Sequence, residues 1–267
     1  MNKIGFIIIL IFSCLIAFYY IVIKPEKYIE NDIYDEIMDR GYVKVGINTD
    51  SKPFGYYCGK KICGYDADLS RYIAQYLFSN SGKLHFYPVT ASNRLIKLTT
   101  GEVDIVIATL TITPQRMQII DFSIPYDVAG QAILVKTGSK IASLGDLAGE
   151  NVGVVWGTTA EKNMLNAMPS ANIIGFKTYN EAYKALKNGK ISAVTSDDTI
   201  LRRFAQEDKG VTLIPKRYSR EPYGIGFKKG RGSDKLKLAL DNAVTDLKQK
   251  NVINRLHKQW LGNSIDE

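Results

Sequence analysis

Histidine and cysteine are scarce in this chain of 267 residues, which has two histidines, three cysteines and two tryptophans. The histidines are His85 and His257, and outside the first residues the only cysteines are Cys58 and Cys63, so we expect no metal site and no cofactor. The motifs G-x-S-x-G and H-E-x-x-H and a Cys/His nucleophile pair are also absent. The sequence therefore predicts no catalytic residues.

The chain also lacks a dense run of lysine and arginine interleaved with aromatic residues. Its net charge is +8, and charged residues make up 23% of the chain. A dispersed basic excess is typical of a solvated surface, so nucleic-acid binding is not predicted. Hydrophobic residues make up 45%, which is enough to build one or two globular domains.

The first residues differ in character from the rest of the chain. Residues 4–23 carry no charge and are flanked by Lys3 and Lys24. A run of this length can cross a bilayer as a helix, whereas a cleavable signal peptide has a shorter apolar core. We therefore expect residues 1–28 to be an N-terminal membrane anchor or signal segment, and we favour an uncleaved transmembrane helix. Cleavage, or lipidation at Cys14, is the alternative.

The stretch YYCGKKICGY places Cys58 and Cys63 on either side of a short turn that contains Gly59. Two aromatic or apolar runs flank this turn, which predicts a hairpin whose strands face each other at the two cysteines. A disulfide is plausible there and would imply an oxidising compartment. The alternative is a pair of free thiols.

Apolar strands and amphipathic helices alternate from residue 42 onward. YVKVGI (42–47) predicts a strand, YDADLSRYIAQYLF (65–78) a helix, and VDIVIA (103–108) a strand buried on both faces. The same alternation continues through residues 151–205, and two helical patterns end the chain. This order predicts an α/β protein with parallel sheets and crossover helices.

Two segments of the chain share one layout. LTTGEVDIVIATLT (98–111) and LKNGKISAVTSDDT (186–199) each run from a helix end through glycine to an apolar strand and a polar loop, so that Thr109 matches Asp197. This predicts two lobes of similar design, each with a polar loop at the C-terminal end of a strand, where open α/β sheets bind ligands.

Prolines mark two predicted connections between the lobes. IPYDVAGQ and SREPYG each carry proline before an apolar strand, and proline excludes helix there. Two extended crossings form a hinge that can open and close on a ligand. We expect one lobe to comprise residues 29–127 and 222–267, and the other residues 128–221.

Arg116 is the first candidate ligand-binding residue, in the stretch TLTITPQR. Its guanidinium fits a carboxylate in bidentate fashion, and the Thr111 hydroxyl can assist. Thr113 and Pro114 predict the start of a short helix that holds Arg116 above the strand end. An ion pair of Arg116 with Asp104 or Asp121 on the surface is the alternative.

Two further polar loops follow strands in the second predicted lobe. Thr158 and Thr159 begin a helix after Gly157, where backbone N–H groups attract an anion, although they can also be plain helix caps. Asp197 and Asp198 begin another helix, so one acid can cap it while Asp197 pairs with an ammonium group. Arginine, threonine and aspartate together complement a zwitterion, which favours an α-amino acid over a sugar or a phosphate.

Several stretches of the sequence resemble those of a known family. GYDADLSRYIA, SNRLIKLTTGEVDIVIATLTITPQRMQIIDFSIPY, GTTAEKN, SDDTIL and EPYGIGFKKG occur in this order. The chain resembles, over residues 38–262, the polar amino-acid family of extracytoplasmic solute-binding proteins of ABC importers. The resemblance implies a two-lobed, type II periplasmic-binding-protein fold with two crossover hinge segments, closing on its ligand.

The resemblance also implies roles for individual residues. Arg116 and Thr111, with Thr158 and Thr159, would bind the ligand carboxylate, and Asp197 would take the ammonium group. The side-chain end of the pocket would then be lined by four further candidates. The resemblance suggests Asp50, Phe54 and Arg94, and the place of Thr109 at the strand end suggests this residue as well.

The implied function is the binding of a polar amino acid and its delivery to an ABC permease in the membrane. Arg94 favours glutamate or aspartate as ligand, followed by glutamine or cysteine. The resemblance implies a monomer without enzymatic activity, located outside the cytoplasm. Tethering by the N-terminal segment is inferred from this sequence alone, because the anchor departs from the usual signal or lipoprotein start of the family. Alternatives are an enzyme resembling cyclohexadienyl dehydratases, which needs a general acid in the cleft, and a receptor for a separate signalling partner.

Overall fold

The structure is a computed structural model that describes residues 32–214 and 216–262. The predicted membrane segment, residues 1–28, lies outside the described residues. In the part that is described, no helix has both the length and the apolar character needed to cross a membrane. Residues from Asp32 onward form one compact unit.

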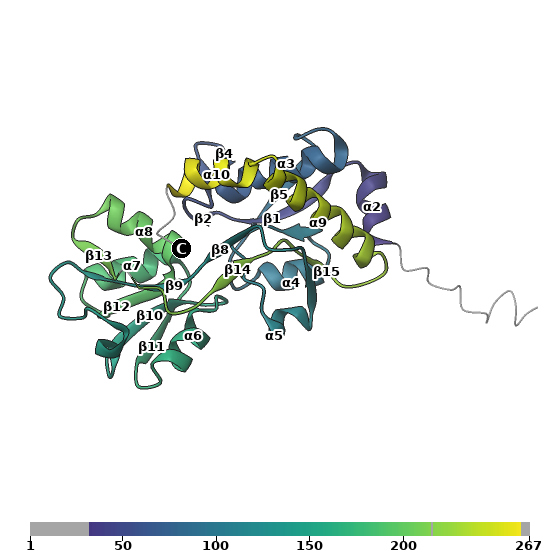
Figure 1. The fold of residues 1–267 in the computed structure, drawn as a ribbon. Coiled ribbons are helices and arrows are strands. Elements are labelled where there is room, and N and C mark those ends of the chain that lie inside the picture. The colour runs from purple at the N-terminus through teal and green to yellow at the C-terminus, as the bar shows by residue number, and fades with distance from the viewer. Residues whose placement is uncertain (1–31, 215, 263–267) are drawn as a thin grey trace, which may run out of the picture. The chain divides into compact units, whose positions relative to one another are not determined.

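Two five-stranded sheets form the centres of two lobes (Figure 1). The strand order in the first sheet is β5 (Leu84–Val89), β1 (Val43–Asn48), β6 (Ile105–Val106), β15 (Gly226–Lys228) and β7 (Ile120–Phe122). In the second sheet the order is β11 (Asn172–Phe176), β10 (Asn151–Val155), β12 (Ala193–Asp197), β9 (Gln131–Lys136) and β13 (Val211–Ile214).

The two sheets have the same pattern of strand directions. In the first, β1 is parallel to β5 and β6, and β15 is antiparallel to β6 and β7. In the second, β10 is parallel to β11 and β12, and β9 is antiparallel to β12 and β13. The predicted similarity of the lobes is confirmed at the level of topology. The predicted parallel pairs are present in both sheets, and β7, β9, β13 and β15 add antiparallel pairs that were not predicted.

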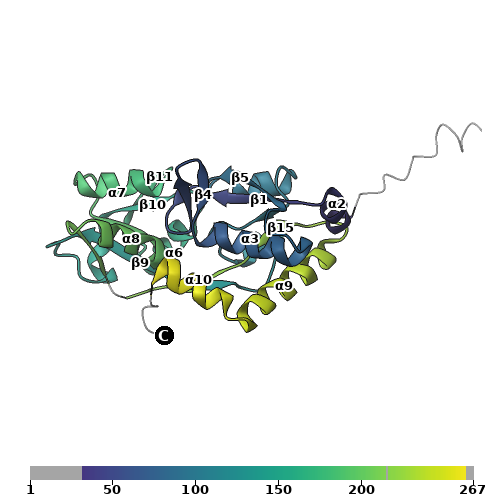
Figure 2. The ribbon, with the colours of Figure 1, turned by 90° about the horizontal axis from the view of Figure 1, so that it is seen from above.

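Helices cover the sheets of both lobes (Figures 1 and 2). In the first lobe, α3, α9 and α10 pack against one another and α2 packs on α9, whereas α4 contacts the strands β1, β6 and β15. The bounds are α2 (Ile33–Arg40), α3 (Tyr65–Phe78), α4 (Arg94–Thr99), α5 (Pro114–Met117), α9 (Ser233–Gln249) and α10 (Val252–Leu261). The second lobe has α6 (Ala160–Ala167), α7 (Tyr179–Lys187), α8 (Asp198–Glu207) and the 3₁₀ turn η2 (Leu144–Leu147).

Local sequence patterns account for the elements that frame the site. The helix predicted over residues 65–78 is confirmed, with Leu69 and Ile73 buried on its apolar face. The strand predicted over 103–108 is shorter, because only Ile105 and Val106 join the sheet. Val103, Ile107 and Ala108 are nevertheless buried, so this segment lies in the core on both sides as its composition predicts.

Two short strands connect the lobes. The strands β8 (Asp127–Ala129) and β14 (Glu221–Tyr223) pair antiparallel, with Glu221 opposite Ala129. Both run between the two lobes in Figure 1. They coincide with the proline-containing connections that the sequence predicts as hinges.

A three-stranded sheet of β2 (Asp50–Ser51), β3 (Gly55–Cys58) and β4 (Lys61–Cys63) carries the two cysteines. They form a disulfide with a Cα–Cα distance of 5.9 Å, so the hairpin and its disulfide are confirmed. The expected register is wrong in one respect. Cys58 lies opposite Lys61 and Cys63 opposite Tyr56, so the disulfide joins diagonal rather than facing positions.

Candidate ligand site between the lobes

Arg116 is held at the edge of the first lobe by a capped helical turn. The Thr113 hydroxyl accepts a hydrogen bond from the Arg116 amide at 3.2 Å, and Pro114 is the first helical residue, as the sequence predicts. The guanidinium is buried and donates to the carbonyl of Thr111 at 2.8 Å and to that of Gly157, in the second lobe, at 3.0 Å. Arg116 therefore points at the interface of the two lobes.

The surface ion pair considered for Arg116 does not form. Asp104 pairs with Arg40, and Asp121 lies 3.5 Å from Lys229. Both acids are thus matched by other cations. The alternative that Arg116 is a surface residue is wrong, because its side chain is only 8% exposed.

Arg94 lies beside Arg116 and is even more deeply buried. It donates to the carbonyls of Ala108 and Thr109 in its own lobe, and to the Gly157 carbonyl at 3.3 Å. Its Nε is buried without a hydrogen-bond partner among the described residues. Sequence resemblance places Arg94 at the side-chain end of the pocket, whereas the structure brings it to the carbonyl that Arg116 also contacts.

The two arginines form a cationic pair that lacks a carboxylate partner in the described part of the chain. The hydrogen bonds that their guanidinium groups donate to described residues all go to backbone carbonyls. Burial, together with the nearby charge of Arg94, lowers the pKa of Arg116 to about 9. A carboxylate placed between the lobes would relieve this repulsion, because it supplies the missing counter-charge.

The strand end next to Arg94 is held in a strained conformation. Thr109 has a φ of 47°, which a β-branched residue rarely adopts. Its amide donates to the carboxylate of Asp66 at 3.0 Å, and the Tyr126 hydroxyl donates to the other oxygen of Asp66 at 3.0 Å. Burial raises the pKa of Asp66 to about 7. This network fixes the loop that carries the three carbonyls bound by the arginines, those of Ala108, Thr109 and Thr111.

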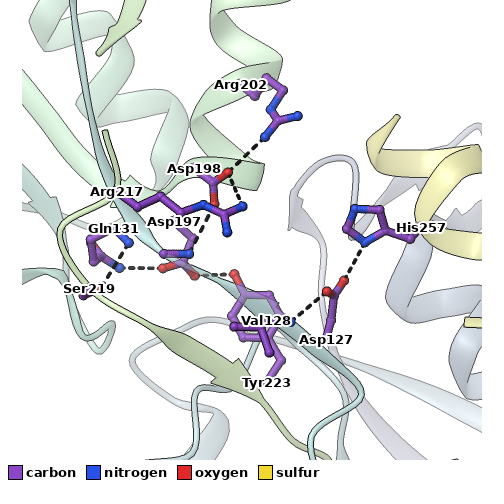
Figure 3. Close-up of polar contacts among 11 residues, drawn as sticks. Asp127, Val128, Gln131, Asp197, Asp198, Arg202, Arg217, Ser219, Tyr223 and His257 are labelled. Atoms are coloured by element: carbon purple, nitrogen blue, oxygen red, sulfur yellow. Dashed lines mark hydrogen bonds and ion pairs between the residues drawn. The ribbon is translucent and has the colours of Figure 1, made fainter. Parts of the chain in front are cut away.

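Asp197 lies at the end of β12 in the second lobe, and Figure 3 shows it between Gln131 and Tyr223. One carboxylate oxygen accepts from Gln131 Nε2 at 2.5 Å, and the other from the Tyr223 hydroxyl at 2.5 Å. Burial raises the pKa of Asp197 to about 7, and the charge of Glu221 acts in the same direction. No cation among the described residues forms an ion pair with Asp197, so it can accept an ammonium group.

Asp198 has a different role from its neighbour. It pairs with Arg202 at 3.0 Å and with Arg217 at 2.8 Å, and it accepts from the Gly130 amide at 3.2 Å (Figure 3). Neither acid caps α8 through its side chain, so the expectation of an acidic cap is wrong. Asp198 is neutralised within its own lobe, which leaves Asp197 as the acid available to a ligand.

Thr158 and Thr159 lie where β10 leads into α6. The Thr158 hydroxyl donates to the Val155 carbonyl at 2.7 Å and accepts from the Ala160 amide at 3.2 Å. The Thr159 hydroxyl donates to the buried carboxylate of Glu221 at 2.7 Å instead of capping the helix. Of these two hydroxyls, only that of Thr158 satisfies an N-terminal amide of α6.

The remaining predicted residues surround this centre. Asp50, on β2, is half-buried, and burial raises the pKa of its carboxyl while Arg203 and Arg94 oppose that shift. Phe54 is fully buried, with its ring 5.7 Å from Tyr65 and 5.8 Å from Tyr223.

Thr111 is also buried and forms an isolated β-bridge with Tyr223. Trp156, which the sequence leaves without a role, is 44% exposed. A Cβ on Gly175 would come within 1.8 Å of its ring, so Trp156 lies directly over the backbone of β11.

Four residues of this site were not predicted from the sequence: Asp66, Gln131, Glu221 and Tyr223. Glu221 and Tyr223 lie in the EPY stretch. An acidic residue before a buried strand was the one sequence feature there that could have indicated a site residue. The contacts of Asp66 and Gln131 join positions far apart in the chain, so no local pattern indicates them. Within the described range, no group of three or more His, Cys, Asp or Glu side chains is arranged to hold a metal ion.

The fold and this interface define a class of protein. The cysteine-binding protein of Campylobacter jejuni superposes with a TM-score of 0.82 at 28% identity, over 89% of this chain and 96% of that one. An ancestral amino acid-binding protein, AncCDT-1, described as a precursor of cyclohexadienyl dehydratase, superposes with a TM-score of 0.78 at 33% identity, over 86% and 100%. The chain therefore has the two-lobed type II fold of periplasmic amino-acid-binding proteins.

The family follows from the sequence comparison. Residues 43–263 match the profile of the bacterial extracellular solute-binding proteins, family 3, and the chain belongs to this family. The ABC transporter glutamine-binding protein GlnH of Bacillus subtilis is 35% identical over 241 residues, which is 89% of this chain and 88% of that protein. The predicted family membership is confirmed.

Proposed function

We propose that the chain binds a polar L-amino acid between its two lobes. The observation that carries this proposal is a pair of buried arginines on the first lobe and a buried aspartate on the second, none of which forms an ion pair with another described residue. Arg116, assisted by Thr111 and the Thr158–Thr159 loop, would bind the α-carboxylate, and Asp197 the α-ammonium. A ligand held by both lobes stabilises the closed form by its differential affinity.

We place glutamine first among the ligands, ahead of glutamate or aspartate and of cysteine. Arg94, the reason to favour an acidic ligand, already donates to the carbonyls of Ala108, Thr109 and Gly157. The carboxylate of Asp50 would repel an acidic side chain, whereas it can accept a hydrogen bond from a side-chain amide. The similarity to a glutamine-binding protein supports the same order.

The biological role that we propose is delivery of this amino acid to an ABC permease. Membership of an extracellular solute-binding family supports it. The disulfide between Cys58 and Cys63 is consistent with a location outside the cytoplasm. We keep the predicted lobes, residues 29–127 with 222–267 and residues 128–221, and an N-terminal tether of a monomer as parts of this proposal.

A thermal-shift screen tests the proposed ligand class. The full-length chain in a mild detergent is heated with each of the common L-amino acids and with L-cystine, because a ligand that binds the folded state raises its melting temperature. We expect the largest shift with L-glutamine, a smaller one with L-glutamate and none with D-glutamine. Titration calorimetry then gives the affinity. A chain that responds to no amino acid at 1 mM contradicts the proposal.

We also propose that the chain acts without catalysis, although Asp197 gives a specific reason to test this. With a pKa of about 7, its carboxyl can donate a proton near neutral pH, as a dehydratase requires. The similarity to a precursor of cyclohexadienyl dehydratase points to the same test. Incubation with prephenate and with arogenate should give no product above the uncatalysed background, and product formation would assign an enzyme.

A further inference from the structure

The crossing strand β14 touches the loop of the first lobe that carries Arg116. The Ile112 amide donates to the Pro222 carbonyl at 2.8 Å, and the Gly224 amide donates to the Leu110 carbonyl at 3.0 Å. Thr111 forms its isolated bridge with the same strand. The backbone of β14 is thus part of the frame of the carboxylate-binding loop.

The first side chain of β14, Glu221, reaches into the second lobe. It is 3% exposed, and it accepts hydrogen bonds from the Thr159 hydroxyl at 2.7 Å, from Asn163 Nδ2 at 2.6 Å and from the Ser219 hydroxyl at 2.7 Å. All three donors are uncharged, and no described cation forms an ion pair with Glu221. A buried carboxylate bound in this way ties the start of α6 to the crossing strand.

The third residue of β14, Tyr223, reaches the ammonium side of the site. Its ring is fully buried against Phe54, and its hydroxyl donates to Asp197 at 2.5 Å (Figure 3). Side chains at positions 221 and 223 of one strand project to the same face. One short strand therefore contacts the loop of Arg116, the start of α6 and the acid of the second lobe.

We propose that Glu221 and Tyr223 are positioning residues of the amino-acid site, which set the carboxylate-binding and ammonium-binding halves in register across the hinge. Glu221 acts through Thr159 and the start of α6, and Tyr223 acts through Asp197. This proposal rests on the proposed function and adds two residues to it. Neither residue needs to touch the ligand.

The two residues act on Asp197 in opposite directions. The Tyr223 hydroxyl stabilises the ionised carboxylate, whereas the negative charge of Glu221 destabilises it. The other titratable groups that interact with Asp197 remain present in both variants: Arg94, Arg116, Asp198, Tyr179 and Tyr218. Because the ammonium group pairs with an ionised Asp197, affinity should rise with pH and level off above the pKa of Asp197.

Titration calorimetry of L-glutamine from pH 5.5 to 8.5 tests this with the full-length chain. Tyr223→Phe should move the midpoint of the pH profile upward by about one unit and restore nearly wild-type affinity at pH 8.5. Glu221→Gln should move the midpoint downward and weaken binding about tenfold at its plateau, because glutamine keeps only one acceptor oxygen, whereas Thr159 and Asn163 donate to different oxygens of Glu221.

Matched substitutions outside the site serve as controls. Tyr183 also donates to an aspartate, Asp208, at 2.5 Å, and Glu150 also accepts from a hydroxyl, that of Ser192. Tyr183→Phe and Glu150→Gln should leave both the midpoint and the plateau unchanged. Thermal unfolding without ligand checks that each variant is folded.

The outcomes separate this proposal from the one on which it rests. A wild-type chain that binds no amino acid overturns the ligand site and the positioning residues together. If the wild-type chain binds an amino acid but neither Tyr223→Phe nor Glu221→Gln changes the pH midpoint, the positioning role alone is overturned. The same holds if both variants move the midpoint in the same direction. A shift of equal size in the control variants does so as well.

Discussion

The two lobes have the same strand topology, but the residues at the site end of their sheets carry opposite charges. In each, the middle strand of five, β6 or β12, runs parallel to one neighbour and antiparallel to the other. Carbonyl groups of the loop after β6 accept hydrogen bonds from the two buried arginines, Arg94 and Arg116, and β12 ends at Asp197. The corresponding edges of two similar sheets thus carry opposite charges.

The lobes also differ in how they hold these groups. In the first lobe, Thr109 is strained at a φ of 47° and is held by Asp66 from the same lobe. In the second, Asp197 has an ordinary φ of −59° and is held by Gln131, from β9 of its own lobe, and by Tyr223, from the crossing strand β14. The support of Thr109 therefore lies within the first lobe, whereas the geometry of Asp197 depends in part on a crossing strand.

The largest effect should come from removing the cation of the first lobe. Arg116→Ala should weaken amino-acid binding at least about 100-fold, because the ligand carboxylate would be buried without its bidentate partner. Titration calorimetry measures the loss. Arg255→Ala, which removes an exposed arginine of α10 that donates to the Lys250 carbonyl, should change nothing. Equal affinity of the Arg116 variant and the wild type would refute the site.

Removing the acid of the second lobe should have a somewhat smaller effect, because an amide still accepts hydrogen bonds. Asp197→Asn should weaken binding about 10- to 100-fold and abolish the rise of affinity between pH 6 and 8. Asp198→Asn is the control, since Asp198 is already paired with Arg202 and Arg217. It should lower the melting temperature but keep the affinity within about threefold. Similar losses in both variants would contradict the distinction drawn between the neighbours.

The acid that supports the first lobe should be visible in the pH dependence of stability. The pKa of Asp66 is about 7 in the folded protein, well above its ordinary value of 3.8. The folded state therefore binds more protons between about pH 4 and 7, and the free energy of unfolding should fall as pH rises through this window. Urea denaturation at pH 5 and pH 8 should show a decline that Asp66→Asn reduces by on the order of 1–2 kcal/mol.

Asp146 is the control for this measurement, because hydrogen bonds from Ala142 and Ser143 lower the pKa of its exposed carboxyl. Asp146→Asn should leave the decline between pH 5 and 8 unchanged. A wild-type chain whose stability is constant over this range would show that Asp66 is ionised in the folded protein.

The smallest effect should come from the exposed ion pair that joins the lobes, Lys52 to Glu207 at 2.9 Å. Replacing both residues by alanine should cost less than about 1 kcal/mol and change affinity less than threefold at low salt, because exposed pairs are well screened. The control is the ion pair between Asp246, in α9, and Lys250, directly after the C-terminal end of this helix. A loss of more than tenfold would mean that surface charge, and not the buried residues, holds the lobes together.

Local patterns in the sequence predict much of this architecture. The bounds of α3, the Thr113 cap and the two crossings follow from periodicity and proline, because short-range geometry decides them. The matching glycines Gly101 and Gly189 already indicate two similar lobes. The register at Cys58 and the contacts of Glu221 could not be predicted, because they depend on how segments distant in sequence pack. The resemblance of Arg94 to an arginine of acidic-amino-acid binders likewise did not indicate that its guanidinium donates to backbone carbonyls.

The path of the chain has a consequence for the order in which the protein is built. All strands of the second sheet come from residues 131–214, one continuous stretch. The first sheet places β15, from residues 226–228, between β6 and β7. During synthesis the second lobe can complete its sheet while the first still lacks β15, the strand between β6 and β7. Pulsed hydrogen exchange on refolding should protect β10 before β6, so that the lobe carrying the arginines becomes ready to receive a ligand last.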